Sequence, residues 1–146
     1  MTHDKIIPFL VDKLQKYPDI KFHLGHKGQL TIEPANDEGF KISLWTNKRE
    51  NTLYFSDFYH WHFDNTENEQ TELLNQVLYG LTGVARIKVF TKNDKTYKCS
   101  LEIQDKNKQW GVAGTTSSIN LNFWTPPKFH YLKNNLLPID KMSENQ

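Results

Sequence analysis

The chain has 146 residues, and its 18 lysine and arginine residues balance 17 acidic residues to a net charge of +1. This length is typical of a single domain with its own core, and we expect one domain over residues 1–140, followed by a frayed polar tail over 141–146. So balanced a charge creates no strong field for nucleic acid or anionic lipid, and neither is an expected partner.

Cysteine content and hydropathy indicate a cellular location. Cys99 is the only cysteine, so no internal disulfide can form and nothing points to an oxidising compartment. The apolar run near the N-terminus is broken by Pro8, Asp12 and Lys13, which is not the pattern of a secretory signal. No apolar stretch approaches the roughly 20 residues that span a bilayer. The sequence therefore predicts a cytoplasmic protein.

The first part of the chain reads as one helix followed by four strands. Apolar side chains recur three and four residues apart over 4–17, which predicts an amphipathic helix with Asp4 as its N-cap. From Ile20 the apolar residues alternate instead, and Gly25 and Gly28 mark a hairpin. This two-residue period predicts strands within residues 20–24, 30–32, 40–44 and 53–63.

A second helix follows, and then about four more strands. Thr66 and Glu69 form a capping-box pattern ahead of a leucine-rich stripe that ends at Gly83. Alternation then predicts a hairpin with a polar face, a short strand and a further strand, at residues 85–89, 97–104, 110–112 and 119–123. Residues 114–118 read as a flexible polar loop, and residues 129–137 fit a strand or a short helix.

The order of these elements indicates the fold class. Helix, four strands, helix and about four strands is not the strand–helix alternation of a parallel, doubly wound sheet. The sequence therefore predicts an α+β domain in which one twisted antiparallel sheet of about six to eight strands packs against two α-helices.

Aromatic and imidazole side chains alternate in the segment from Tyr59 to Asp64. In a strand, His60, His62 and Asp64 share one face. Such a group can bind a metal ion, with His23 or His26 as a further ligand, or it can serve as acid and base in a small hydrolase or nuclease, with Lys41, Arg86 or Lys88 near the phosphate. The pattern equally fits a strand with one aromatic core face and one polar face. We favour this second interpretation, which predicts no catalytic residue, no metal and no cofactor.

Aromatic residues make up 13% of the chain, more than a core of this size requires. Trp45 and Trp124 are out of phase with the aliphatic residues of their strands. This pattern fits exposure on a surface that binds another protein, and it equally fits a sheet whose two faces are both covered locally by helices or loops. The alternative is an aromatic pocket between sheet and helix that takes a small ligand. The aromatic residues that we expect to bind are Trp45, Tyr54, Tyr59, Trp61, Trp110 and Trp124.

Four segments carry a resemblance to small uncharacterised bacterial α+β proteins. They are the segment from Tyr59 to Asp64, the leucine-rich helix from Leu73 to Gly83, the pair Phe123-Trp124, and the run from Tyr131 to Asn134. Those proteins are similar in size and style to the immunity proteins of bacterial toxin systems. The resemblance implies a non-enzymatic module that binds another protein, such as a toxin domain, and it transfers no catalytic residue.

Overall fold

The computed structural model describes residues 1–118 and 123–138. This part of the chain contains a short 3-10 turn, η1 (His3–Lys5), and two helices, α1 (Ile6–Leu14) and α2 (Glu67–Thr82). It also contains nine strands: β1 (Phe22–Leu24), β2 (Gln29–Ile32), β3 (Ile42–Trp45), β4 (Glu50–Phe55), β5 (Tyr59–Asp64), β6 (Ala85–Lys92), β7 (Lys95–Gln104), β8 (Trp110–Ser117) and β9 (Lys128–Leu132). Neither helix is long and apolar enough to cross a membrane.

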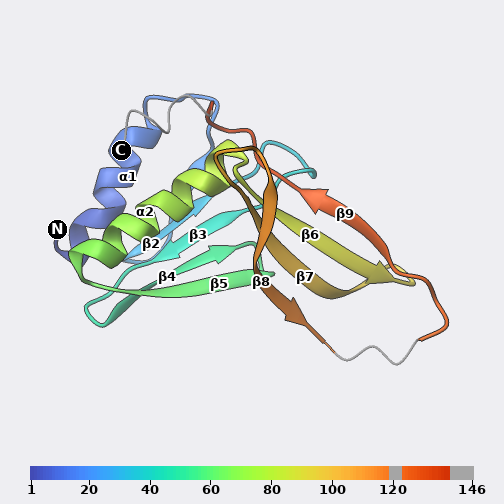
Figure 1. Ribbon diagram of the computed structural model, residues 1–146. Helices are drawn as coiled ribbons and strands as arrows, with labels where there is room; N and C mark the ends of the chain where they lie inside the picture. The colour runs from blue at the N-terminus through green and yellow to red at the C-terminus, as the bar shows by residue number, and fades with distance from the viewer. Residues whose placement is uncertain (119–122, 139–146) are drawn as a thin grey trace.

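The strands form two antiparallel sheets, so the predicted α+β class is confirmed and the predicted single sheet is wrong. The first sheet has five strands in the order β1-β2-β3-β4-β5, and the second has four in the order β8-β7-β6-β9. Both helices lie over one face of the first sheet, and α2 also reaches β6 (Figure 1).

Twist explains why the strands divide into two sheets. Each antiparallel neighbour adds roughly 20–25° of twist, so one open sheet of all these strands would turn away from the helices that cover it. The chain instead leaves β5 through α2, and β6 begins a new sheet. The sheets meet through side chains: the Thr116 hydroxyl on β8 donates to the Phe58 carbonyl at 3.1 Å, and a Cβ atom at Gly114 would collide with the Tyr59 hydroxyl.

The core lies between the helices and the inward faces of the two sheets. It contains Phe40 and alternate strand residues together with the apolar stripes of α1 and α2. Helix α2 approaches the first sheet closely at Gly80, where an added Cβ atom would lie 2.8 Å from Phe55 Cζ and 3.0 Å from Ile42 Cδ1. Phe55 is fully buried and packs against Phe40 and Trp61 at ring-centroid distances of 4.9 and 4.8 Å.

The first sheet has one strand more than predicted, because residues 53–63 form two strands and not one. A turn at Ser56 separates β4 from β5, and Ser56 adopts a left-handed conformation with φ 53°. Its amide donates to the Lys41 carbonyl at 2.7 Å, which fixes the turn against the start of β3. The predicted hairpin before β2 is confirmed, and Gly28 has the positive φ, 84°, that such a turn requires.

Helix α1 does not begin as predicted. Lys5 is its N-cap residue, and no side chain caps the helix. Asp4 lies in η1 instead and accepts a hydrogen bond from the Thr2 hydroxyl at 2.5 Å, which lowers the pKa of Asp4 below its ordinary value. Pro8 is tolerated because it falls in the first turn, where the amide has no partner within the helix.

Helix α2 begins and ends where the sequence predicts. The Thr66 hydroxyl accepts a hydrogen bond from the Glu69 amide at 3.3 Å, and Gly83 ends the helix with φ 85°. In a capping box the Glu69 carboxylate would accept a hydrogen bond from the Thr66 amide. Here it accepts one from the Asp64 amide instead, at 2.6 Å. Glu69 thus connects the end of β5 to the first turn of the helix.

We expect Thr66→Ala to lower the free energy of unfolding by about 1 kcal/mol, because it removes a side-chain cap and no core contact. Chemical denaturation measures the change. Asn68→Ala is the control, since Asn68 is exposed in the same helical turn and should alter stability little. Equal midpoints for Thr66→Ala and the parent would show that the hydroxyl contributes nothing to the helix start.

The second sheet departs from the prediction at β8, which continues to Ser117 where we expected a loop over 114–118. This stretch pairs with β7 past a register irregularity between Leu101 and Glu102. The ambiguous region 129–137 contributes strand β9, which pairs with β6. Phe123 lies in a turn, whereas residues 119–122 of the predicted strand 119–123, the domain end at 140 and the tail 141–146 lie outside the described residues.

A buried asparagine holds the segment after β9 against both layers. Asn134 Oδ1 accepts from the Phe40 amide at 2.9 Å, and Asn134 Nδ2 donates to the carbonyls of Phe40 and Gly80 at 2.9 and 3.1 Å. A Cβ atom at Gly39 would collide with Asn134 Oδ1, so the chain passes Asn134 at a glycine. Asn134 therefore joins α2, the segment before β3 and the end of β9.

Candidate functional site

The face of the first sheet that the helices leave open carries a row of rings. The strand register places Trp45, Tyr54, His60 and His62 on this face, and we call these four residues the ring row. Successive ring centroids lie 5.6 Å apart for Trp45 and Tyr54, 5.5 Å for Tyr54 and His60, and 5.3 Å for His60 and His62. The side chain of Trp45 remains 49% exposed, so the row ends in an open indole.

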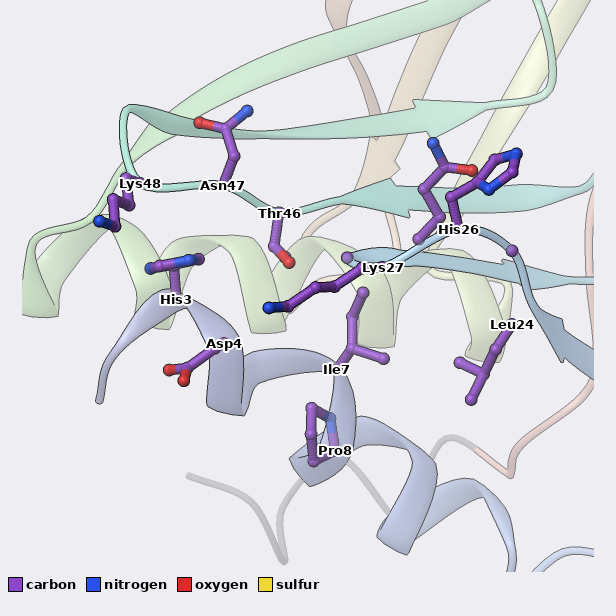
Figure 2. A pocket seen from close by; sticks show the side chains of 13 residues that line it. His3, Asp4, Ile7, Pro8, Leu24, His26, Lys27, Thr46, Asn47 and Lys48 are labelled. Atoms are coloured by element: carbon purple, nitrogen blue, oxygen red, sulfur yellow. The ribbon is translucent and has the colours of Figure 1, made fainter.

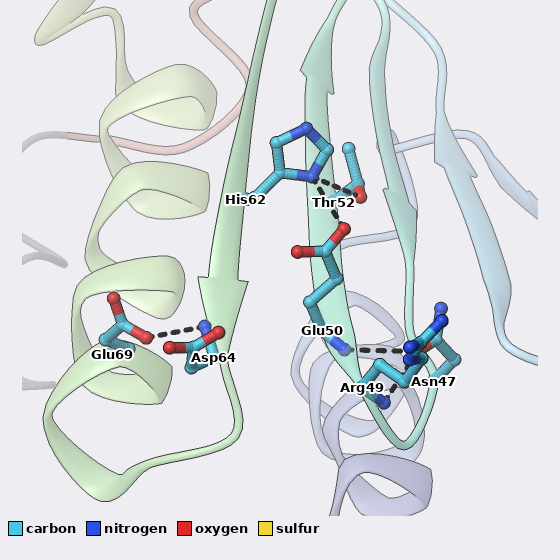
Figure 3. Close-up of polar contacts among 7 residues, drawn as sticks. All are labelled: Asn47, Arg49, Glu50, Thr52, His62, Asp64 and Glu69. Carbon is cyan, nitrogen blue, oxygen red and sulfur yellow. Dashed lines mark hydrogen bonds and ion pairs between the residues drawn. The ribbon is translucent and has the colours of Figure 1, made fainter.

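Polar side chains hold the imidazole end of the ring row. The Nδ1 atom of His62 lies 3.2 Å from Glu50 Oε1 and 3.1 Å from Thr52 Oγ1, both on the neighbouring strand β4 (Figure 3). Asn47 accepts hydrogen bonds from the amides of Arg49 and Glu50 and so fixes the turn from which β4 begins. His62 is therefore oriented by its neighbours on β4.

The structure brings the rings of His60 and His62 together on β5. Asp64 extends the same face, and its backbone amide is bound by Glu69 (Figure 3). His23 lies on β1, four strands away from β5, which is about 19 Å at the usual strand spacing. There it pairs with Glu33 at 3.0 Å. Within residues 1–118 and 123–138, no three His, Cys, Asp or Glu side chains are placed to hold a metal ion.

The cations considered for a nuclease site are divided between the two sheets. Lys41 precedes β3, next to the first sheet, whereas Arg86 and Lys88 lie on β6 of the second sheet. The pair of imidazoles therefore shares its sheet with Lys41 and not with Arg86 or Lys88.

Tyr59 and Trp61 lie on the opposite side of β5 from the ring row. Both are half-buried and pack against the core, with their ring centroids 4.5 Å apart. Trp61 meets Phe55 edge to face, and Tyr59 lies against Gly114 of the second sheet. Tyr59 therefore connects the two sheets, and Trp61 packs beside it.

Trp110 lies on the outer face of the second sheet, next to a fixed cation. The Arg86 guanidinium is 3.8 Å from the centroid of Trp110 and 3.9 Å from that of Tyr131, and Arg86 Nε donates to Glu102 Oε1 at 2.7 Å. The side chains of Arg86 and Glu102 are only 19% and 12% exposed. The ion pair therefore holds both rings in place.

Trp124 is 92% exposed in the connection between β8 and β9. Figure 1 places the end of β8 and the start of β9 at the opposite end of the molecule from the turn between β3 and β4, which follows Trp45. Trp45 and Trp124 thus do not belong to one continuous patch. A single small interface would use one of them.

Two cavities open at helix α1, away from the predicted aromatic residues. The larger, of about 500 Å³, lies between the start of α1 and the turns after β1 and β3, and Lys27 extends across it near His3 and Asp4 (Figure 2). The smaller, of about 410 Å³, lies between α1 and α2 and includes Phe9 and Tyr17. None of the six predicted binding residues lines either cavity.

Cys99 faces the core of the second sheet, as its apolar register predicts. Its side chain is buried, and burial raises the pKa of the thiol above its ordinary value. A buried thiol with a raised pKa is a poor nucleophile.

Several surface residues were not predicted as binding residues. Phe90, Phe129 and Tyr131 share the outer face of the second sheet with Trp110. In the sequence, the alternation of Arg86 and Lys88 with Ile87 indicates that β6 has a polar face. That Phe129 and Tyr131 lie on the same face follows only from the pairing of β9 with β6.

Comparison of the chain with protein families, with curated proteins and with solved structures finds no match in any of the three. The surfaces themselves provide the basis for a function. One is the ring row, which the paired strands β3, β4 and β5 hold in place. The other is the outer face of the second sheet, where cations and rings are interleaved.

Proposed function

We propose that this chain is a non-enzymatic protein-binding module of the cytoplasm that sequesters a bacterial toxin, in the manner of an immunity protein. The ring row is the observation that carries the proposal. It places Trp45 and Tyr54 on a sheet face without a covering helix, and Trp45 is half-exposed.

Such a surface has the properties of a binding hot spot. Large aromatic rings bury much area and lose little conformational entropy when a partner covers them. Tyr54 has a ring on either side, Trp45 and His60, so its conformation is set before binding. The strands beneath add rigidity, because β3, β4 and β5 pair along their lengths. The cost of ordering the surface on binding is correspondingly small.

The electrostatics of this face fit a protein partner better than a polyanion. Carboxylates lie beside the imidazoles on this face, Glu50 at His62 and Glu33 at His23, and carboxylates repel a polyanion. A polar rim around exposed rings is typical of protein interfaces. We infer that the partner contributes an apolar centre opposite Trp45.

The test uses the product of the gene adjacent to this one as the candidate toxin. Co-expression with this chain is expected to restore growth, and the two proteins are expected to purify as a complex. Trp45→Ala should weaken that complex by roughly thirtyfold or more, which corresponds to about 2 kcal/mol at a hot-spot ring. Isothermal titration calorimetry measures the affinity.

A stability measurement and two further variants, Val112→Ala and Trp124→Ala, show whether the loss of binding is specific to the ring row. Trp45→Ala should leave the unfolding midpoint almost unchanged, because half of the side chain is already in water. Val112→Ala is the control, since Val112 is 65% exposed on the second sheet and should not affect the complex. If Trp124→Ala weakens binding while Trp45→Ala does not, the interface lies at the connection between β8 and β9 and our placement is wrong.

A further inference from the structure

The outer face of the second sheet interleaves cations with aromatic rings. Across three neighbouring strands the register pairs Lys88 with Tyr131, and Phe90 with both Lys98 and Phe129. Residues between these positions, such as Ile87 and Val89, are buried beneath the sheet. We call the outward set, with Arg86 and Trp110 beside it, the cation–aromatic face.

Its lysines rest on rings and not on carboxylates. The Nζ atom of Lys88 lies 4.1 Å from the centroid of Phe129 and 5.1 Å from that of Phe90, and Lys98 Nζ lies 4.9 Å from Phe90. Lys133 approaches Trp110 at 5.6 Å. In the part of the chain that the structure describes, none of these three lysines forms an ion pair, whereas Arg86 is neutralised by Glu102. The face therefore has a local excess of positive charge that the net charge of +1 conceals.

We propose that the cation–aromatic face binds single-stranded nucleic acid. A polyanion that also carries flat rings matches both components of this face, since lysines neutralise phosphates and exposed aromatic rings stack with bases. Phe129 and Tyr131 are 55% and 38% exposed and can accept a base. The sequence prediction of no nucleic-acid partner was based on the overall charge, and the proposal rests on how the charge is distributed.

The relative strengths of lysine–ring and base–ring contacts favour replacement of the lysines by bases when nucleic acid binds. An exposed lysine over a ring is worth about 0.5–1 kcal/mol, whereas a stacked base is worth about 1–3 kcal/mol. The lysines can therefore leave the ring faces, turn to phosphates and let bases take their place. Arg86 behaves differently, because Glu102 keeps it between Trp110 and Tyr131. It keeps those rings ordered while the lysines move.

An acidic protein segment is the competing occupant. It would satisfy the lysines but would leave the exposed rings of Phe129 and Tyr131 without a flat partner. The interleaving of rings with cations therefore favours nucleic acid. This site lies on the second sheet and does not depend on the toxin-binding function proposed for the first.

Fluorescence anisotropy with the full chain at low salt tests the proposal with three labelled probes: oligo-dT, an abasic oligodeoxynucleotide of the same length, and poly-glutamate. Oligo-dT should bind most tightly, by about tenfold over the abasic probe, because only it has bases to stack. Phe129→Ala should remove most of this advantage and leave the abasic affinity unchanged. Lys98→Gln should weaken both nucleic-acid probes and reduce the salt dependence by about one phosphate contact. Lys41→Gln, next to the first sheet, is the matched control and should change nothing.

Several results would overturn the proposal. Equal affinity for oligo-dT and the abasic probe would show that the rings do not take bases. Poly-glutamate binding as tightly as oligo-dT would assign the face to an acidic protein, and absence of binding to all probes at low salt would remove the site. Thermal unfolding of each variant shows that it is folded, and Tyr131→Ala replaces Phe129→Ala if the latter unfolds.

Discussion

Asn134→Ala is expected to lower the free energy of unfolding by about 4 kcal/mol. The substitution removes three hydrogen bonds from a side chain that is almost fully buried. It leaves the amide and carbonyl of Phe40 and the carbonyl of Gly80 without their partner, and each such buried group costs about 1–3 kcal/mol. The Gly80 carbonyl belongs to the last turn of α2, where the helix itself provides no amide to donate to it.

Urea denaturation of Asn134→Ala beside Asn135→Ala measures this effect. Asn135 is the next residue and is exposed, so its replacement should shift the midpoint little. A similar midpoint for both variants would show that the bonds of Asn134 are replaced by water or by neighbouring groups at little cost.

Phe55→Ala is expected to lower the free energy of unfolding by about 3–5 kcal/mol, because it opens a cavity where α2 crosses the sheet. The cavity should remain largely open, since the helix faces Phe55 with Gly80 and has no side chain there to fill the space. Differential scanning calorimetry or denaturation in urea gives the change.

A double-mutant cycle with Gly80→Ala separates packing from helix propensity. In the parent, the new methyl group would lie 2.8 Å from Phe55 Cζ, so Gly80→Ala should be destabilising despite the better helix propensity of alanine. In the Phe55→Ala background the methyl group no longer meets the Phe55 ring, although Ile42 Cδ1 still lies at 3.0 Å, so the same substitution should be much less destabilising. A favourable coupling of about 1 kcal/mol or more is expected, and additive effects would mean that Gly80 and Phe55 are not in close contact.

Local patterns in the sequence predict much of this fold. Helix α2 follows from Thr66, its apolar stripe and Gly83, and the alternation around Leu30, Ile42 and Leu101 correctly indicates strands with one buried face. The turn at Ser56 was missed because neither glycine nor proline marks it, and the apolar residues continue on both sides. Asp4 resembles an N-cap in the sequence, but the extra turn η1 moves the helix start beyond it.

Long-range pairing is what the sequence does not predict. The alternation in β6 shows one buried and one polar face but does not reveal that β9 lies beside it or that β5 does not. For the same reason Arg86 could be predicted as exposed, but its position between Trp110 and Tyr131 could not. The ring row is an intermediate case: His60 and His62 lie two residues apart on one strand, whereas Tyr54 joins them only through the register of β4.

The position of β9 has a consequence for the order in which the protein folds. Each strand from β1 to β4 pairs with the next strand along the chain, and β6 and β7 do the same, so these pairings close short loops. Strand β9 instead returns past β8 and β7 to reach β6, which requires a much longer loop to close. We therefore expect β9 and the bonds of Asn134 to form late, after the rest of both sheets. In the reverse direction, this segment should detach first and expose the outer edge of β6 before the two sheets lose their structure.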